Sequence, residues 1–236
     1  MADKKEIFGS YFVKKFVVEV RHKPNLLHNE NVPQILNEMM GDFNKVTLIN
    51  DTVQKTFQIL NSNDYFLFTS DWTKVSTAFE NVKDFESAFQ KATKNIISYL
   101  TKSKITAFTR LGFRVSYLLP FDGKFEELVT YFKDKFYNDL SIYEPFGNIE
   151  DVGIVALTIN DKNFKGHLSI GPMTKIEVKD KIAEFKNYDL DFESSLLVDL
   201  DLYIDTASMQ SMKAFIDVVY DTSRLKIVKF REHLND

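Results

Sequence analysis

One alternating stretch at the middle of the chain, Thr106 to Phe121 (TAFTRLGFRVSYLLPF), constrains the fold most. Along it, apolar residues and threonine alternate with Arg110, Gly112, Arg114 and Ser116. A period of two is typical of a β-strand with one face in a core and the other face polar. We therefore expect a long strand whose two arginines share the polar face, about 13 Å apart along the strand.

The remaining sequence predicts two units with the same order of elements, a strand, a helix, several antiparallel strands and a long amphipathic helix. We place the first unit at residues 1–104 and the second at 105–236, with an insertion at 172–195, in one compact globule. Within the first unit the predicted elements are a strand at 12–21, a helix from about 31 to 41, four short strands between 45 and 80, and a helix at 83–102. In the second unit they are the strand at 106–119, a helix at 124–136, strands at 151–160, 164–170 and 196–205, and a helix from 208.

This order predicts an α+β protein. Two tandem β-α-β(3-4)-α units would form a curved antiparallel sheet with helices on one side, which is the arrangement of the TATA-binding-protein-like fold. Aligning the two units places Arg21 and Arg114 at the same position. The alternative is a helix-grip fold, in which the sheet wraps one helix around an apolar cavity.

Composition limits the classes of function. The chain has no cysteine, which excludes disulfides, thiolate metal sites and cysteine nucleophiles and favours a cytoplasmic location. No apolar run approaches the length of a membrane span, so we expect no membrane association. A net charge of -4 makes nucleic-acid binding a less favoured alternative, because that binding relies on clustered lysine and arginine.

Motifs that announce an enzyme are missing from the sequence. It contains no GxSxG, no GxxxxGK[ST] and no GxGxxG after a strand, and its histidines do not have the spacing of a zinc site. We therefore predict no cofactor and favour a protein without catalytic activity.

An acidic cluster near the C-terminus offers the main alternative. Asp199 and Asp201 alternate with apolar residues, so their carboxylates would share one face of a strand about 6.6 Å apart. Such a pair can hold a divalent cation or act in acid–base chemistry, with His167 as a further candidate. The simpler interpretation is a salt-bridged outer face, in which these aspartates pair with Arg110 and Arg114 on a neighbouring strand.

Three segments together resemble an uncharacterised bacterial and archaeal protein family of about this length with a sporadic distribution. They are Val17 to Arg21 (VVEVR), Thr109 to Val115 (TRLGFRV), and the C-terminal helix with Phe215, Val219 and Phe230. The resemblance implies a cytoplasmic protein and an accessory role in a defence-type system, and it implies no catalytic residues.

We therefore expect an interaction or assembly protein that docks a protein partner or a second copy of itself through its exposed sheet face. The interaction residues would be Glu19, Arg21, Arg110 and Arg114. One alternative is small-molecule or metal binding, with or without hydrolysis, in a cavity between sheet and helices. Nucleic-acid binding on the curved sheet is the other.

Overall fold

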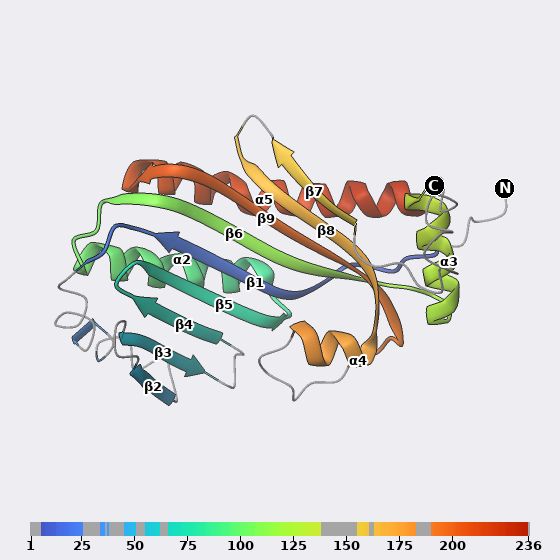
Figure 1. The fold of residues 1–236 in the computed structure, drawn as a ribbon, viewed down its shortest axis with the longest axis horizontal. Coiled ribbons are helices and arrows are strands. Elements are labelled where there is room, and N and C mark those ends of the chain that lie inside the picture. The colour runs from blue at the N-terminus through green and yellow to red at the C-terminus, as the bar shows by residue number, and fades with distance from the viewer. Residues whose placement is uncertain are drawn as a thin grey trace, which may run out of the picture.

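A computed structural model describes residues 6–25, 34–35, 37, 45–50, 55–61, 66–137, 155–160, 163–182 and 190–235 (Figure 1). Its strands are β1 (Phe12–Arg21), β2 (Lys45–Asn50), β3 (Lys55–Asn61), β4 (Phe66–Asp71), β5 (Lys74–Val82), β6 (Ala107–Pro120), β7 (Val155–Asn160), β8 (Lys165–Thr174) and β9 (Ser194–Ser208). Its helices are α2 (Phe85–Lys102), α3 (Phe125–Phe136), α4 (Lys175–Glu177), which continues into the π-helical turn η3 (Val178–Ile182), and α5 (Met209–Asn235).

The strands form one antiparallel sheet in the order β2-β3-β4-β5-β1-β6-β9-β8-β7. The chain is therefore an α+β protein, as its sequence predicts. Strands β1 and β6 are the first strands of the two predicted units, and they pair with each other near the middle of the sheet. The long alternating stretch is thus an inner strand, bonded to β1 on one side and to β9 on the other.

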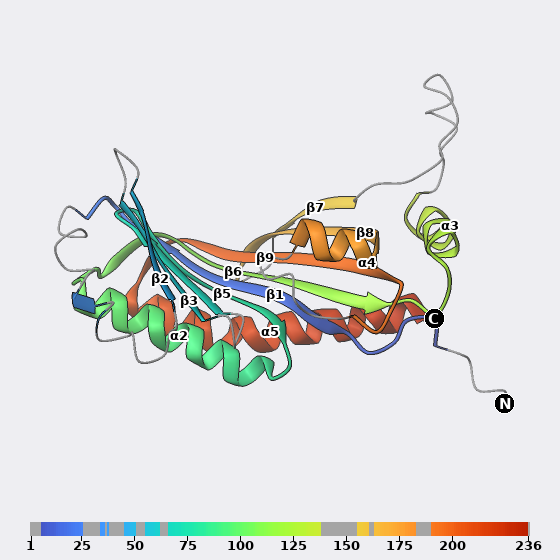
Figure 2. The ribbon, with the colours of Figure 1, turned by 90° about the horizontal axis from the view of Figure 1, so that it is seen from below.

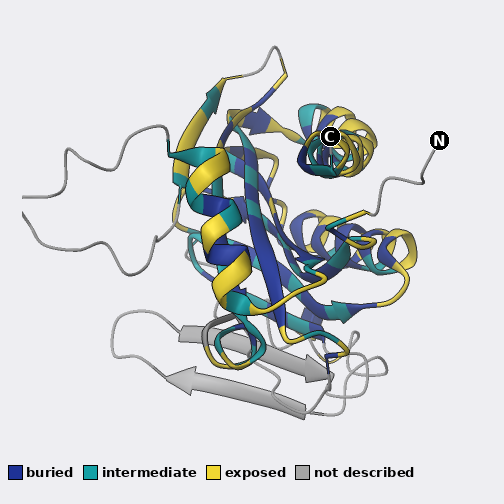
Figure 3. Ribbon diagram, turned by 90° about the vertical axis from the view of Figure 1, so that its right-hand side faces the viewer, coloured by how far each residue is buried: buried dark blue, intermediate teal, exposed yellow. Residues whose placement is uncertain are grey.

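The two long helices lie on the same face of the sheet (Figure 2). Helix α2 begins where the side chain of Asp84 accepts a hydrogen bond from the backbone N–H of Ser87, which satisfies one free donor of the first turn. Its buried residues recur at helical spacing, as they do along α5. Strands in the middle of the molecule are mostly buried, whereas the helices have one buried and one exposed side (Figure 3). The helix-grip alternative has one helix on this face, and the described part of the chain has two long ones, α2 and α5.

The core between this sheet face and the helices is aromatic. Phe113 of β6 lies 6.0 Å from the ring of Phe16 on β1 and 5.4 Å, edge to face, from Phe89 on α2. Helix α3 joins the core at the end of the molecule where α5 finishes, since the Tyr131 hydroxyl donates to the carbonyl of Leu234. Aromatic contacts thus connect the central strands to α2, and a hydrogen bond connects α3 to α5.

The expectation that all helices lie on one side of the sheet is wrong, because the predicted insertion contains a helix on the other side. Segment α4–η3 lies on the other side of the sheet (Figure 2). It covers a second, smaller apolar cluster that includes Leu118, Leu197 and Val178. Leu118 and Leu197 lie on the strand faces that elsewhere carry arginine and aspartate, so this end of the polar face requires a cover.

Gly112 occupies an unbroken register on both sides of β6, so it marks no bulge. The irregularity lies instead in β1, between Val13 and Lys15, where Lys14 is the extra residue relative to β6. Gly112 lies instead next to the side chain of Arg110, whose guanidinium is its nearest neighbour on that face.

Most predicted elements are confirmed with small changes at their ends. Strands β8 and β9 are longer than predicted, because β8 ends and β9 begins inside the 172–195 insertion and β9 also continues beyond its predicted end to Ser208. The insertion also contains the short helix that its mixed polarity allowed. The predicted helix at 31–41, apart from 34–35 and 37, the loop at 146–150 and the first residues of the 151–160 strand lie outside the described residues. In the described part of the chain, every helix is too short or too polar to cross a bilayer.

Candidate functional site

The sheet face opposite α2 and α5, which we call the open face, carries every predicted site residue. Pairing registers place Val17, Arg114, Asp201, His167 and Thr158 side by side in one row across β1, β6, β9, β8 and β7. Neighbouring rows contain the other predicted residues, Glu19 with Gly112, Arg21 with Arg110, and Ser116 with Asp199.

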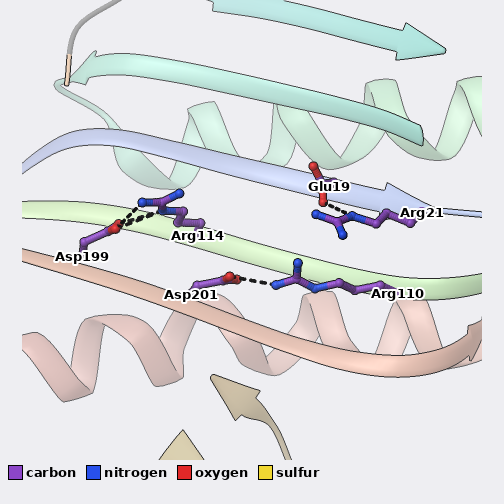
Figure 4. Close-up of polar contacts among 6 residues, drawn as sticks. All are labelled: Glu19, Arg21, Arg110, Arg114, Asp199 and Asp201. Carbon is purple, nitrogen blue, oxygen red and sulfur yellow. Dashed lines mark hydrogen bonds and ion pairs between the residues drawn. The ribbon is translucent and has the colours of Figure 1, made fainter. Parts of the chain in front are cut away.

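Arg114 and Asp199 form the first fixed ion pair of the open face (Figure 4). The Nε atom of Arg114 donates to both carboxylate oxygens of Asp199 at 3.0 Å, and the hydroxyl of Ser116 donates to the same carboxylate at 3.1 Å. Hydrogen bonding to Asp199 raises the pKa of the Arg114 guanidinium above its ordinary value. The pair is diagonal, because the residue directly opposite Arg114 is Asp201.

Arg110 forms the second pair and lies flat on the sheet. Its Nη2 donates to Asp201 at 2.7 Å, and its guanidinium lies 4.3 Å from the ring centroid of Tyr203. The ring of His167 on β8 stacks with that of Tyr203, and their centroids are 5.9 Å apart. A Cβ atom at Gly112 would stand 3.7 to 3.8 Å from the Arg110 guanidinium, an ordinary van der Waals separation, so the Arg110 side chain passes over Gly112 and an alanine there would still fit beneath it.

Two arginines face each other at one point of the open face, and each is paired with a nearby carboxylate that reduces the repulsion between them. Arg21 is directly opposite Arg110 in the β1–β6 register. Its Nε donates to Glu19 at 2.7 Å, while the guanidinium of Arg110 is paired with Asp201 (Figure 4). Lys74 of β5 lies 3.9 Å from the second oxygen of Glu19. The predicted charge ladder between arginines and aspartates is confirmed.

In several of these pairs the cation is the more exposed partner. The side chain of Arg114 is 61% exposed and that of Asp199 only 14%. For Arg21 and Glu19 the exposed fractions are 50% and 21%. The open face therefore presents guanidinium groups to solvent above carboxylates that neutralise them.

The arrangement gives little support to a metal site at Asp199 and Asp201. Each carboxylate already accepts hydrogen bonds from a guanidinium. Among the described residues, no group of three or more His, Asp and Glu side chains has the geometry to hold a metal ion. Catalysis by this pair would first require a charge-assisted hydrogen bond to break.

A cleft of about 580 Å³ lies on the helix side, between the N-terminal end of α2 and helix α5. Its lining includes Tyr11, Phe85, Tyr220 and Arg224. Asp199, Asp201 and His167 lie on the opposite face of the sheet. The sequence-based alternative that combined these residues with a cavity between sheet and helices does not correspond to this cleft.

Sequence reasoning missed the residues that complete the open face. Tyr203 was not singled out, although it follows Asp201 by two positions and therefore shares its face. Lys165 and Asp205 lie on the same face by the same rule, and the sequence did not predict the exposed ion pair that they form at 2.8 Å. Alternation was the available signal for Tyr203, but it was applied only to the charged residues and to His167.

Outside the open face, His22 at the end of β1 is a buried histidine whose pKa is shifted. It is buried, its Nδ1 lies 2.8 Å from the carbonyl of Lys23, and its Nε2 has no hydrogen-bond partner among the described residues. Burial lowers the pKa of His22 below its ordinary value. Nδ1 therefore carries the proton at neutral pH, and charging Nε2 is unfavourable in the folded state.

We expect this histidine to make stability depend on pH. Because the folded pKa is lower than the unfolded one, the unfolded chain binds more protons, and stability falls as pH drops below about 6.5. Thermal unfolding of wild type and of His22→Phe between about pH 5 and 8 would measure this. As the pH is lowered, the melting temperature of wild type should fall more than that of His22→Phe. An equal dependence of melting temperature on pH in the two proteins would contradict the assignment.

No protein-family model matches this chain, and neither a curated protein nor a solved structure is significantly similar to it.

Proposed function

We propose that the chain is a non-enzymatic assembly protein that binds an acidic protein surface through its open face. The observation that carries the proposal is the Arg110–Tyr203–His167 stack, held in place by Asp201 at the middle of that face. Arginine and tyrosine are enriched among residues that dominate binding energies. Side chains that are already fixed lose little conformational entropy on binding.

The charge arrangement supports a protein partner. Exposed guanidinium groups at Arg21 and Arg114 complement carboxylates, and they sit beside the aromatic surface of Tyr203 and His167. Each arginine also has a carboxylate beside it, and such a face of mixed charge and aromatic rings suits the varied side chains of a protein better than the uniformly anionic backbone of a nucleic acid. A second copy of the chain and a nucleic acid are the alternative occupants that the experiment below distinguishes.

We further propose that the sheet derives from two tandem units of the TATA-binding-protein-like kind. From the β1–β6 pair the order outward is β5, β4, β3 on one side and β9, β8, β7 on the other. If Arg21 corresponds to Arg114, then Glu19 corresponds to Gly112, and these two residues are direct partners in the β1–β6 register. A pseudo-twofold axis through that pair would relate the two halves.

This interpretation fits a cytoplasmic accessory component, the role that the family resemblance implies. Such a protein acts by bringing other chains together, and it needs no catalytic group of its own.

A charge swap tests the docking proposal. Arg114→Asp combined with Asp199→Arg keeps an ion pair between β6 and β9 but buries the cation and exposes the carboxylate. We expect the doubly substituted protein to unfold at nearly the wild-type temperature. Its affinity for the partner should fall at least about tenfold. Reversing Arg110 and Arg114 to glutamate is a less clean test, because it would place four carboxylates together.

The readout is the mass of complexes isolated from host cells, by light scattering after size-exclusion chromatography. Lys213→Asp, at an exposed position of α5 on the helix side, is the matched control and should retain the partner. Unchanged assembly in the charge-swapped protein contradicts the proposal. A partner that is DNA or RNA, with affinity falling steeply as salt rises, would replace the acidic protein.

A further inference from the structure

Strand β7 ends the sheet and lacks the features that normally protect an edge strand. Within the described residues it pairs only with β8. Its sequence, VALTIN, contains no charged residue, no proline and no glycine, and its six residues pair with β8 in an unbroken register. Natural edge strands usually carry a lysine, a proline or a bulge that prevents pairing with another chain. Strand β2, at the opposite edge, begins with a lysine.

Apolar side chains on this edge are also exposed. Leu157 is 51% exposed and is one of the most exposed large apolar residues of the described chain. Val155, Leu157 and Ile159 lie on the helix side of the sheet, in register with Ile170, Leu168 and Gly166 of β8. They extend the core to the edge of the sheet, where no described element covers Leu157.

We propose that β7 is a dimerisation edge that pairs antiparallel with β7 of a second copy. A twofold axis perpendicular to the sheet keeps the helix side of one copy next to the helix side of the other. Residues that lie directly opposite each other must therefore belong to the same face, so both have odd numbers or both have even numbers. With the axis at Leu157, this residue meets its own counterpart. Val155 then meets Ile159 of the second copy, and Ala156 meets Thr158.

The strand is complementary to itself in this register. Apolar residues oppose apolar residues on the helix side, and the small and hydroxyl side chains oppose each other on the open face. No charge of β7 opposes a like charge, because the strand has none. Edge N–H and C=O groups that face outward would be satisfied by the second copy.

Size predicts a reversible dimer. Two six-residue strands bury less area than a typical stable interface, so dissociation in the micromolar range is expected. Pairing uses the same strand, β7, in both copies, so neither copy has a free β7 edge left and the assembly stops at two chains. Both open faces would then lie on the same side of one continuous sheet and could bind a partner with two sites.

Disulfide trapping tests the register directly, because the chain has no cysteine of its own. Opposite residues in an antiparallel pair have Cα atoms about 4.5 to 5.5 Å apart, within the range of roughly 4.4 to 6.8 Å that a disulfide spans. Leu157→Cys should form a covalent dimer under mild oxidation. The control Ile176→Cys, at an exposed apolar residue of α4, should not.

Sedimentation velocity from about 1 to 100 µM gives the second readout. Wild type should be a concentration-dependent dimer, and Leu157→Lys, which places two ammonium groups face to face, should weaken it about tenfold or more. Ile176→Lys should leave it unchanged. A monomer at all concentrations, equal trapping at both cysteine positions, or assemblies larger than dimers would overturn the proposal. The Arg114/Asp199 charge swap should not affect this dimer, so failure here is distinguishable from failure of the docking proposal.

Discussion

Replacement of Phe113 by alanine is expected to lower the free energy of unfolding by about 4 kcal/mol. The residue is fully buried at the middle of β6, and its ring contacts Phe16, Phe85 and Phe89. Truncation removes its burial and leaves a cavity at the point where the two halves of the sheet meet.

Urea denaturation of the two proteins measures this effect. Leu225→Ala, at an exposed position of α5, is the control and should change stability by no more than about 0.5 kcal/mol. If Phe113→Ala costs less than about 1 kcal/mol, the junction of β1 and β6 is not the centre of the core.

Lys14→Met is expected to stabilise the protein by about 2 kcal/mol at neutral pH. Lys14 is fully buried at the bulge in β1, and burial lowers its pKa from 10.5 to about 8, against the opposing effect of Glu80. The charged form is thus unfavourable in the folded state. Glu80 retains Lys15 at 3.5 Å after the substitution, so its carboxylate is not left without a cation.

The pH dependence identifies the cause of that gain. The folded pKa of Lys14 is below the unfolded one, so the unfolded chain binds the extra proton between about pH 8 and 10.5. Wild-type stability should contain a contribution that rises with pH through this window, and Lys14→Met should lack it. Melting curves at about pH 7 and 10 measure the difference. A destabilised Lys14→Met protein would show that the ammonium is needed for the fold.

Alternation and helical spacing were sufficient to predict most of the described elements. The predicted strand at residues 12–21 has the bounds of β1, and the helix predicted at 83–102 differs from α2 by two residues. Both depend on local periodicity, which the sequence contains in full. Sheet order depends on contacts between distant segments, and the pairing of β1 with β6 could only be suggested by the repeated order of elements.

The open face was predictable by residue type and less so by geometry. Arg110, Arg114, Asp199 and Asp201 were predicted to pair, and they do. Register places Asp201 opposite Arg114 and Asp205 opposite Arg110, yet the ion pairs run diagonally to Asp199 and Asp201, and the spacing of residues in the sequence does not reveal this choice.

The sequence also contained an indication that segment α4–η3 would cover one end of the open face, in two adjacent apolar residues that break the alternation of β6. Leu118 and Leu119 are adjacent, so they point to opposite faces of β6, and both are buried. Two adjacent buried residues in a strand require a layer on each side. The 172–195 insertion supplies the second layer.

A photoreactive residue at position 203 would test the central claim, that the open face binds an acidic protein surface. Tyr203→p-benzoylphenylalanine places the probe in the Arg110–Tyr203–His167 stack, and the same probe at Leu225 on α5 is the control. On irradiation in host cells we predict one protein adduct at position 203, through a peptide rich in aspartate and glutamate, that disappears when the Arg114/Asp199 charge swap is added. Adducts only at position 225, or an adduct at 203 that survives the charge swap, would contradict the account.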